Sequence, residues 1–481
     1  MSLRWPLLLA GFNLMLLQLL YVRELSSTLW SCELAILSVM LAYFAGLSLG
    51  YLLGERLTPP QVALGWLAAV SLHLPLIFGI RVLVGWLRST EVTWAILPMV
   101  FLLTALLLTG FYSILLPRAL VGRPESLPLS YSLELLGALV ALGVAVLVPG
   151  AVSAAPLVYE ASLLAIGLGL GLGRPMLVGG VLVAVVVLAL LGPMDRISTL
   201  YLYGRSFPEL RPWQDSRVLA TRRSPYQKIE VLESPKGSRA LFLNGLMYYN
   251  EADLRWYNTY VTLLPARLRP GGRVLVVGSG SLDAVARLSQ SAGSITTVEL
   301  DAEVAAVGQE FFHPRQELGA PWTLVIDDAK HFLATTSEQF DLIVMDVPAP
   351  FYVQTGLLCT REFYQLCRAR LAPGGIVSVC LAEDFVPDRP NRAAGPILKA
   401  LQGVFAAVVV VNGPESGLSF AYASDQPISE PSLREASLAV KANQIEVVAP
   451  EALSRSLQGH APATLDDLRL VWVLNRWNLE P

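Results

Sequence analysis

Long apolar runs, interrupted by very few charges, fill the first part of the chain and restrict what it can fold into. A helix needs about 20 apolar residues to cross a bilayer. Seven runs therefore predict transmembrane helices: residues 5–22, 32–53, 62–86, 92–116, 129–149, 152–173 and 175–192. We predict a multi-pass α-helical membrane domain over residues 1–192.

After this region the composition becomes that of an ordinary globular domain. Over the whole chain, 54% of residues are hydrophobic and 15% are charged. This is too apolar for a soluble enzyme and too charged for a protein that lies wholly within a membrane. We predict three further parts: a juxtamembrane linker over residues 193–215, an enzyme-like domain over residues 216–425 and a C-terminal extension over residues 426–481.

Charge and cysteine usage disfavour several classes of partner and cofactor. The formal net charge is −3, and no basic block indicates nucleic-acid binding. The four cysteines match no metal-binding spacing and the four histidines are scattered. We expect no nucleic acid, no metal and no prosthetic group, and we expect the lipid bilayer as a partner.

Ionisable side chains occur within or beside the predicted spans, among them Glu24, Arg81, Glu134 and Glu160. Such groups are costly in hydrocarbon and usually face the interior of a helix bundle or a cavity. Near the end of a span they can instead snorkel to the interface. We favour snorkelling for Glu24, whereas both interpretations stay open for Glu134 and Glu160.

The second half of the chain has the pattern of an α/β domain. "SPYQKIEVLES" and "RALFLNGLMYY" flank a "PKGS" turn and predict a β-hairpin. Apolar strands and helical stretches then alternate, the strands being "RVLVVG", "SITTVE", "WTLVI", "DLIVMD" and "GGIVSVC". This order predicts a doubly wound, Rossmann-like sheet of the type found in S-adenosylmethionine-dependent transferases, with ligands at the carboxyl ends of its strands.

Three of these strand ends carry residues that suit an adenosine ligand. Gly278 and Gly280 allow the backbone to approach a ligand closely, and Glu299 ends the next strand at the distance expected for a ribose-binding acid. Asp328 follows the third strand, where it could accept a hydrogen bond from an adenine amino group. Asp283 begins the helix after the glycine turn and would repel a pyrophosphate, so we favour an S-adenosyl compound over a dinucleotide.

These motifs resemble those of the spermidine synthase (polyamine aminopropyltransferase) family. The resemblance covers roughly residues 215–425 and includes "SPYQKIEV", "LFLNG", "VVGSGSLDAVARL", "VELD", "DDAKHFL" and "DLIVMDVPAPFYVQTGLLCTREFY", in the family's order. The helices ahead of this domain resemble a membrane-spanning bacterial subgroup of the family.

The resemblance implies a role for each matching residue. It makes Asp346 the base that accepts a proton from the attacking amine, with Tyr257 beside it. It implies a nucleoside site formed by Gln227, Gly278, Gly280, Ser281, Glu299, Asp328 and Ala329. It implies a substrate site that includes Tyr226, Asp253 and Tyr352. Decarboxylated S-adenosylmethionine, or S-adenosylmethionine itself, would be the co-substrate, and an amine or polyamine would be the acceptor.

The sequence also departs from the family's pattern in the region that binds the amine. Family acids are replaced by Ser281 and Ala349, and a substrate-side acid by Asn244. Tyr248, Leu254 and Asn258 stand at further polar positions of the family. Three alternatives follow: an aminopropyltransferase with an altered acceptor, a transferase that uses intact S-adenosylmethionine, or a sensor in which an adenosyl ligand controls the membrane half.

The resemblance also gives a location and an assembly. An adenosyl ligand is cytosolic, so we expect the enzyme-like domain in the cytoplasm and the helices in the cell's inner membrane. The protein should be a homo-oligomer, namely a dimer.

Overall fold

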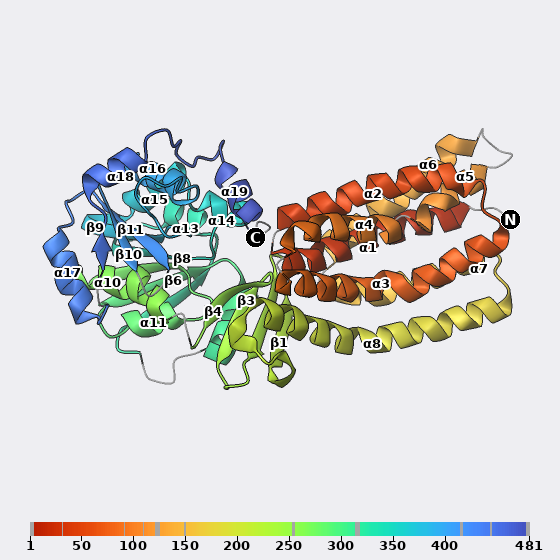
Figure 1. Cartoon of the computed structure of the whole chain (residues 1–481), viewed down its shortest axis with the longest axis horizontal. Coiled ribbons are helices and arrows are strands. Elements are labelled where there is room, and N and C mark those ends of the chain that lie inside the picture. Colours follow the sequence, from red (N-terminus) through yellow and green to blue (C-terminus); the bar gives the residue numbers. More distant parts are fainter. Residues whose placement is uncertain are drawn as a thin grey trace. The chain divides into compact units, whose positions relative to one another are not determined.

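The computed structural model describes residues 4–30, 32–90, 92–108, 110–120, 126–148, 151–252, 255–312, 318–413, 417–442 and 445–477. The chain divides into two compact units, one up to Val218 and one from Leu219 onward. The first is helical, and the second contains all the strands from β2 onward (Figure 1).

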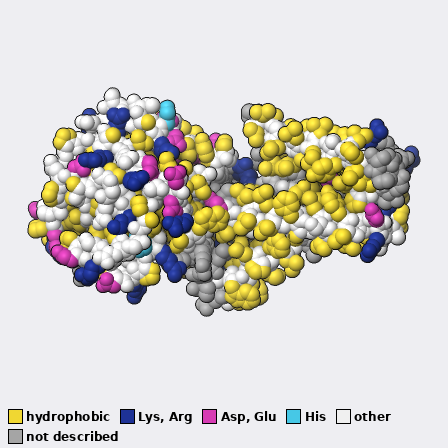
Figure 2. Space-filling model, turned by 90° about the horizontal axis from the view of Figure 1, so that it is seen from above, with side chains coloured by type: hydrophobic (Ala, Val, Ile, Leu, Met, Phe, Trp, Pro, Cys, Tyr) yellow, Lys and Arg dark blue, Asp and Glu magenta, His cyan; other side chains and the backbone are white. Residues whose placement is uncertain are grey.

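The helical unit consists of eight α-helices in its described part. They are α1 (Arg4–Leu29), α2 (Cys32–Gly54), α3 (Pro59–Ser89), α4 (Ile96–Leu108), α5 (Leu115–Leu120), α6 (Leu127–Leu147), α7 (Ala151–Gly169) and α8 (Arg174–Ser206). Five of the described helices, α1, α2, α3, α6 and α8, are long and apolar enough to cross a membrane. Apolar side chains cover much of the face of this unit seen in Figure 2.

The helices differ in two ways from those predicted by the apolar runs. The runs over residues 92–116 and 152–173 form the shorter helices α4 and α7. Helix α8 continues beyond residue 192 to Ser206, through the start of the predicted linker, although Pro193 lies inside it. A proline removes only one N–H donor, and the apolar and aromatic residues that follow sustain the helix.

A buried ion cluster joins three segments of the helical unit. The guanidinium of Arg81 lies 2.7 Å from Glu24 Oε2 and 2.6 Å from Asp195 Oδ1. Arg81 also donates to the hydroxyls of Ser198 and Thr199 at 3.1 and 2.8 Å. Glu24 is only 6% exposed, so the snorkelling interpretation of this residue was wrong. It lies in the interior because a paired charge can be buried where a single one cannot.

The second unit contains two sheets. The smaller has the order β1-β2-β3-β4, so the predicted hairpin, β2 (Lys228–Glu233) and β3 (Arg239–Leu243), is the centre of a four-stranded sheet with β1 (Arg217–Arg223) and β4 (Leu246–Asn250). The larger has the order β12-β10-β11-β9-β8-β5-β6-β7. Its strands are β5 (Arg273–Gly278), β6 (Ser294–Glu299), β7 (Trp322–Ile326), β8 (Phe340–Asp346), β9 (Leu371–Cys380), β10 (Ala407–Gly413), β11 (Leu418–Ser424) and β12 (Glu446–Val447).

The larger sheet is parallel over β9-β8-β5-β6-β7 and antiparallel beyond β9. Helices cover both of its faces (Figure 1). Alternate residues of β5 enter different cores: Val274 and Val276 pack on one side, and Leu275 and Val277 on the other. This three-layer arrangement confirms the predicted Rossmann-like fold of the C-terminal half, in which the sheet is mixed.

The helices fall into two groups according to the face they cover. One face packs against α10 (Leu264–Arg267), α11 (Asp283–Leu288) and α17 (Glu430–Ala439). The other packs against α13 (Ala329–Thr335), α15 (Arg361–Ala369), α16 (Ala394–Gln402), α18 (Pro450–Ser456) and α19 (Arg469–Trp477).

The residues after 425, predicted as a polar extension, belong to the core of this unit. Leu433 is fully buried on one face, and Leu457 and Leu474 are buried on the other. Strand β12 pairs with β10 at the edge of the sheet. The apolar residues of this segment are sparse along the sequence, so its polar average concealed the buried face of each helix.

The ion cluster predicts how the helical unit responds to loss of Arg81. The substitution Arg81→Leu leaves the buried carboxylate of Glu24 without its guanidinium partner, which should lower the stability by about 3–5 kcal/mol. Thermal unfolding of the detergent-purified protein measures this effect. The double variant Glu24→Leu/Arg81→Leu should recover part of the loss.

The exposed Arg174 provides the control. An Arg174→Leu variant should unfold close to the wild-type temperature. If Arg81→Leu is as stable as Arg174→Leu, the cluster does not hold these helices together.

Candidate active site

The predicted catalytic acid lies beside the glycine turn because their strands are neighbours. Strands β5 and β8 are parallel, and their last residues, Gly278 and Asp346, are register partners. Gly278 has a φ of +90°. A Cβ built at this position would lie 2.1 Å from the main-chain oxygen of Asp346. Only glycine fits here, because a side chain would be strained and would also collide with the strand end.

Tyr248, from β4 of the small sheet, forms hydrogen bonds at the ends of both β5 and β8. Its hydroxyl donates to the main-chain oxygen of Asp346 at 2.6 Å. The N–H of Ser279 donates to the same oxygen at 3.2 Å and to the Tyr248 hydroxyl at 3.3 Å. The turn, the small sheet and the end of β8 therefore form one hydrogen-bonded group.

The carboxyl group of Asp346 is buried and incompletely bonded. The residue is 3% exposed, and its Oδ2 has no hydrogen-bond partner among the described residues. Burial, together with the negative charges of Asp283 and Glu299, raises the pKa of Asp346 to about 7, although hydrogen bonding by the nearby Tyr248 hydroxyl lowers it. A carboxyl group with this pKa can both accept and release a proton near neutral pH.

The predicted nucleoside-binding acids end the strands on one side of Asp346. Glu299 ends β6, accepts from the N–H of Asp301 at 3.0 Å, and has its pKa raised to about 7 by burial. Asp328 precedes α13, and its Oδ1 accepts from the N–H groups of Lys330 and His331 at 2.7 and 3.3 Å. Asp328 is therefore an N-cap as well as a candidate ligand. Ala329 begins α13 and packs in the core.

The two predicted residues before β2 lie in different environments. The side-chain amide of Gln227 donates to Asp301 Oδ2 at 3.2 Å, close to the turn that follows Glu299. Tyr226 is 54% exposed. It is not part of the cavity described below.

The glycine turn continues into a polar cluster that the sequence did not indicate. Ser281 is buried, and its hydroxyl accepts from the N–H of Asp283 at 3.4 Å. Asp283 accepts hydrogen bonds from Asn258 at 2.7 Å and from Tyr249 at 3.2 Å, and it pairs with Arg287 at 2.5 Å. Asp283 forms an ion pair with Arg287. Its negative charge nevertheless raises the pKa of Asp346.

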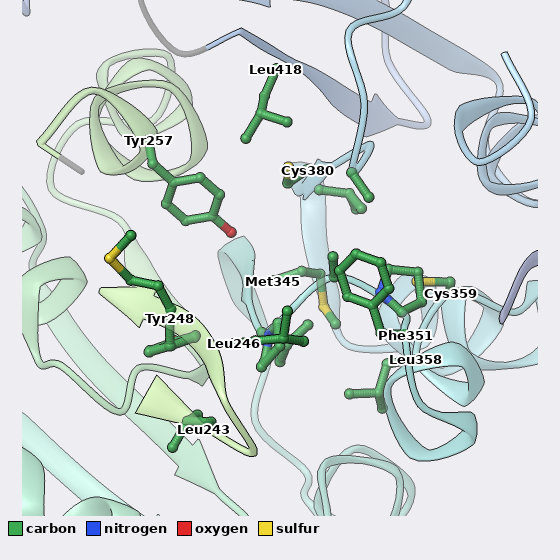
Figure 3. A pocket seen from close by; sticks show the side chains of 17 residues that line it. Leu243, Leu246, Tyr248, Tyr257, Met345, Phe351, Leu358, Cys359, Cys380 and Leu418 are labelled. Carbon is green, nitrogen blue, oxygen red and sulfur yellow. The ribbon is translucent and has the colours of Figure 1, made fainter. Parts of the chain in front are cut away.

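A cavity of about 240 Å³ opens beside the end of β8 (Figure 3). We name it the strand-end cavity. Its described lining consists of Leu243, Leu246, Met247, Tyr248, Tyr257, Met345, Val347, Pro348, Ala349, Pro350, Phe351, Leu358, Cys359, Val379, Cys380, Ala382 and Leu418. The lining therefore comes from the small sheet, from α9 (Arg255–Asn258), from the end of β8 and the segment after it, from the end of β9 and from the start of β11.

Tyr257 directs its hydroxyl into this cavity (Figure 3). Burial, with smaller effects of Cys380 and Asp346, holds the pKa of Tyr257 well above its usual value, so the hydroxyl remains a donor. Tyr352 lies outside the described lining, and its hydroxyl donates to the main-chain oxygen of Asn244 at 3.3 Å. Asp253, the other predicted substrate-binding residue, lies outside the described residues.

The sequence did not indicate three features of the site: the clamp made by Tyr248, the partners of Asp283, and the cavity lining from β9 and β11. The first two depend on the small sheet and α9 (Arg255–Asn258) packing near the glycine turn. Within the described residues, no group of three or more His, Cys, Asp or Glu side chains is placed to hold a metal ion.

Comparison with known proteins adds an independent finding. The profile of the spermine/spermidine synthase domain matches residues 255–410. A polyamine aminopropyltransferase from Erwinia tasmaniensis is 30% identical over 224 residues, which cover 44% of this chain and 76% of the relative. The chain belongs to the spermine/spermidine synthase family. This is a family of transferases, as the resemblance implied.

Other relatives of the family match a smaller part of their own length. A polyamine aminopropyltransferase from Pseudomonas syringae pv. tomato is 32% identical over 192 residues, and the chain spans 64% of that protein. The solved spermidine synthase from Thermotoga maritima is 21% identical, with a TM-score of 0.38 over 50% of this chain and 84% of that one. The region matched by the domain profile, residues 255–410, lies in the second unit.

The raised pKa of Asp346 predicts a pH-dependent stability. Between the ordinary carboxyl pKa of 3.8 and about 7, the folded state holds a proton that the unfolded state releases. Stability contributed by this group is therefore present at low pH and is lost as the pH rises toward 7. The variant Asp346→Asn cannot ionise, so it should gain stability relative to wild type over this range, by up to about 4 kcal/mol.

Thermal unfolding at pH 5 and pH 8 checks this prediction. Asp466→Asn, a change at an exposed aspartate, is the control and should follow the wild type at both pH values. A constant difference between wild type and Asp346→Asn would show that Asp346 titrates normally in the folded protein.

Proposed function

We propose that the chain is a membrane-bound aminopropyltransferase, which moves the aminopropyl group of decarboxylated S-adenosylmethionine to an amine. The observation that carries this proposal is the buried, unpartnered Oδ2 of Asp346 at the junction of the glycine turn and the strand-end cavity. A buried acceptor without a donor is costly unless a ligand supplies one. An ammonium group supplies such a donor.

The nucleoside would lie on the side of β5, β6 and β7. The ribose hydroxyls would donate to Glu299, and the adenine amino group would donate to Asp328. The two capping bonds of Asp328 both use Oδ1, which leaves Oδ2 for a ligand. Gly278 and Gly280 would let the main chain approach the sulfonium end of the nucleoside, next to Asp346.

The reaction would proceed by direct displacement. The acceptor binds as an ammonium ion and transfers one proton to Asp346, which leaves a neutral nitrogen with a free electron pair. This nitrogen attacks the carbon next to the sulfonium, a new C–N bond forms, and the C–S bond breaks to release methylthioadenosine. Since the sulfonium is already a good leaving group, the protein contributes mainly positioning and proton acceptance.

The proposal places the five apolar helices in the cell's inner membrane and the second unit in the cytoplasm. Their length and composition support it. An adenosyl donor made in the cytosol would then reach the site without crossing the bilayer.

Intact S-adenosylmethionine is a second candidate donor. Its support is Ser281, which stands in the glycine turn without a charge, whereas an acid there would repel the donor's carboxylate. The two donors release different thioethers, namely methylthioadenosine from the decarboxylated form and S-adenosylhomocysteine if the intact form donates its methyl group.

The test is turnover by the purified full chain with each donor and a mixed pool of amines, followed by mass spectrometry of the thioether. We expect methylthioadenosine from the wild type. Asp346→Asn should reduce the rate by roughly 10²–10⁴-fold, because a positioned base contributes about this much. Methylthioadenosine binding, measured by calorimetry, should be retained.

Asp466→Asn again serves as the matched control and should keep wild-type turnover. Equal turnover by wild type and Asp346→Asn would reject the assignment of the base. S-adenosylhomocysteine as the sole thioether would favour the second donor.

A further inference from the structure

We propose that the acceptor is a primary monoamine with an apolar body, and that the body occupies the strand-end cavity while the amino group meets Asp346. This inference rests on the proposed function, since it names the substrate class of the same site. It departs from the polyamine acceptors that the relatives' names indicate.

The order of the strands separates the two halves of the site. Glu299 ends β6 and Asp328 follows β7, and both strands lie on one side of β5. The strand-end cavity lies on the other side, where β8 and β9 end at Asp346 and Cys380. A nucleoside on the acids therefore leaves this cavity for the acceptor.

Asp346 is not itself among the described lining residues of the strand-end cavity, but it lies between Met345 and Val347, which both line it. The charge of Asp346 also acts on Tyr257 and Cys380, two further lining residues. An amino group bonded to Asp346 would thus have its substituent directed into the cavity.

The lining has the character of a site for apolar groups. Of the seventeen lining residues that the structure describes, none has a charged side chain. The hydroxyl of Tyr248 is already engaged with the end of β8. Burial raises the pKa of Cys380 to about 11 and that of Cys359 to about 12, so both thiols are neutral at physiological pH.

A second ammonium group would be poorly accommodated in such a cavity. It would lose its water, and the described lining offers no carboxylate in return. Ala349, in the segment after Asp346, adds a methyl group to this lining. An alkyl or aryl group instead gains from burial, by about four-fold in an equilibrium or rate constant for each methylene.

The cavity also has room for the body of a small amine. Its volume is about 240 Å³, far above the roughly 10–15 Å³ that a single water molecule needs on the same kind of measure.

The experiment compares two acceptors of equal length that differ in one terminal group, hexylamine and 1,5-diaminopentane. The purified full chain receives decarboxylated S-adenosylmethionine and one amine, and released methylthioadenosine gives kcat/KM. We expect hexylamine to exceed the diamine by at least about 100-fold, because the diamine's second ammonium must be desolvated. From propylamine to hexylamine, kcat/KM should rise by about four-fold per methylene.

The variant Ala349→Asp tests the cause of the preference. An acid placed in the lining should lower the ratio of the hexylamine kcat/KM to the diamine kcat/KM by at least about ten-fold, by Coulomb attraction to the second ammonium. Ala349→Asn has a similar size without the charge and should keep the wild-type preference. Ala306→Asp, at an exposed position of α12 (Ala302–Val307), should also keep it.

Each outcome separates this inference from the proposed function. Faster turnover of the diamine by the wild type would overturn the monoamine inference and leave the aminopropyl transfer intact. If none of the tested amines is turned over, the proposed function is rejected. Binding of the two amines then decides the monoamine inference. Hexylamine, but not the diamine, should raise the unfolding temperature in the presence of methylthioadenosine; equal effects or no effect would overturn it.

Discussion

The contact between Gly278 and the end of β8 is the constraint on which the rest of the site depends. The glycine brings its main chain against the Asp346 oxygen, at a distance that no side chain would permit. Ser279 and Tyr248 then donate to this same oxygen. The main chain of Asp346 is therefore held from two directions, at the point where β8 ends beside the glycine turn.

Two buried acids show how differently the chain uses such groups. Glu24 lies inside the helical unit, where Arg81 pairs with it at 2.7 Å. This ion pair connects α1 to α3. Asp346 is equally buried and keeps an oxygen without a described partner. A protein gains nothing in stability from the second arrangement, because an unpaired buried carboxyl raises the free energy of the folded state. This arrangement supports the proposal that Asp346 meets a ligand.

Much of the second unit could be predicted from the sequence, because strands such as β5 and β8 are apolar runs that end in a glycine or a carboxylate. The carboxyl ends of such strands lie along one edge, so Gly278, Glu299 and Asp346 were expected together.

The Tyr248 clamp and the partners of Asp283 could not be predicted, since they depend on how the small sheet and α9 pack against this edge. The capping role of Asp328 and the exposure of Tyr226 also depend on the local backbone, which a pattern of residue types does not specify. Helix α8 and the segment after residue 425 also differ from the prediction. Pro193 does not end α8, and the polar residues after 425 do not prevent their apolar neighbours from packing in the core.

We propose that the nucleoside and the acceptor occupy opposite sides of Asp346. A structure of the full chain with methylthioadenosine bound would locate the nucleoside. We expect the adenine next to Asp328 and Ala329, the ribose on Glu299, the sulfur facing Asp346, and the strand-end cavity free of the nucleoside. Methylthioadenosine within the cavity, or bound away from Glu299, would contradict this arrangement.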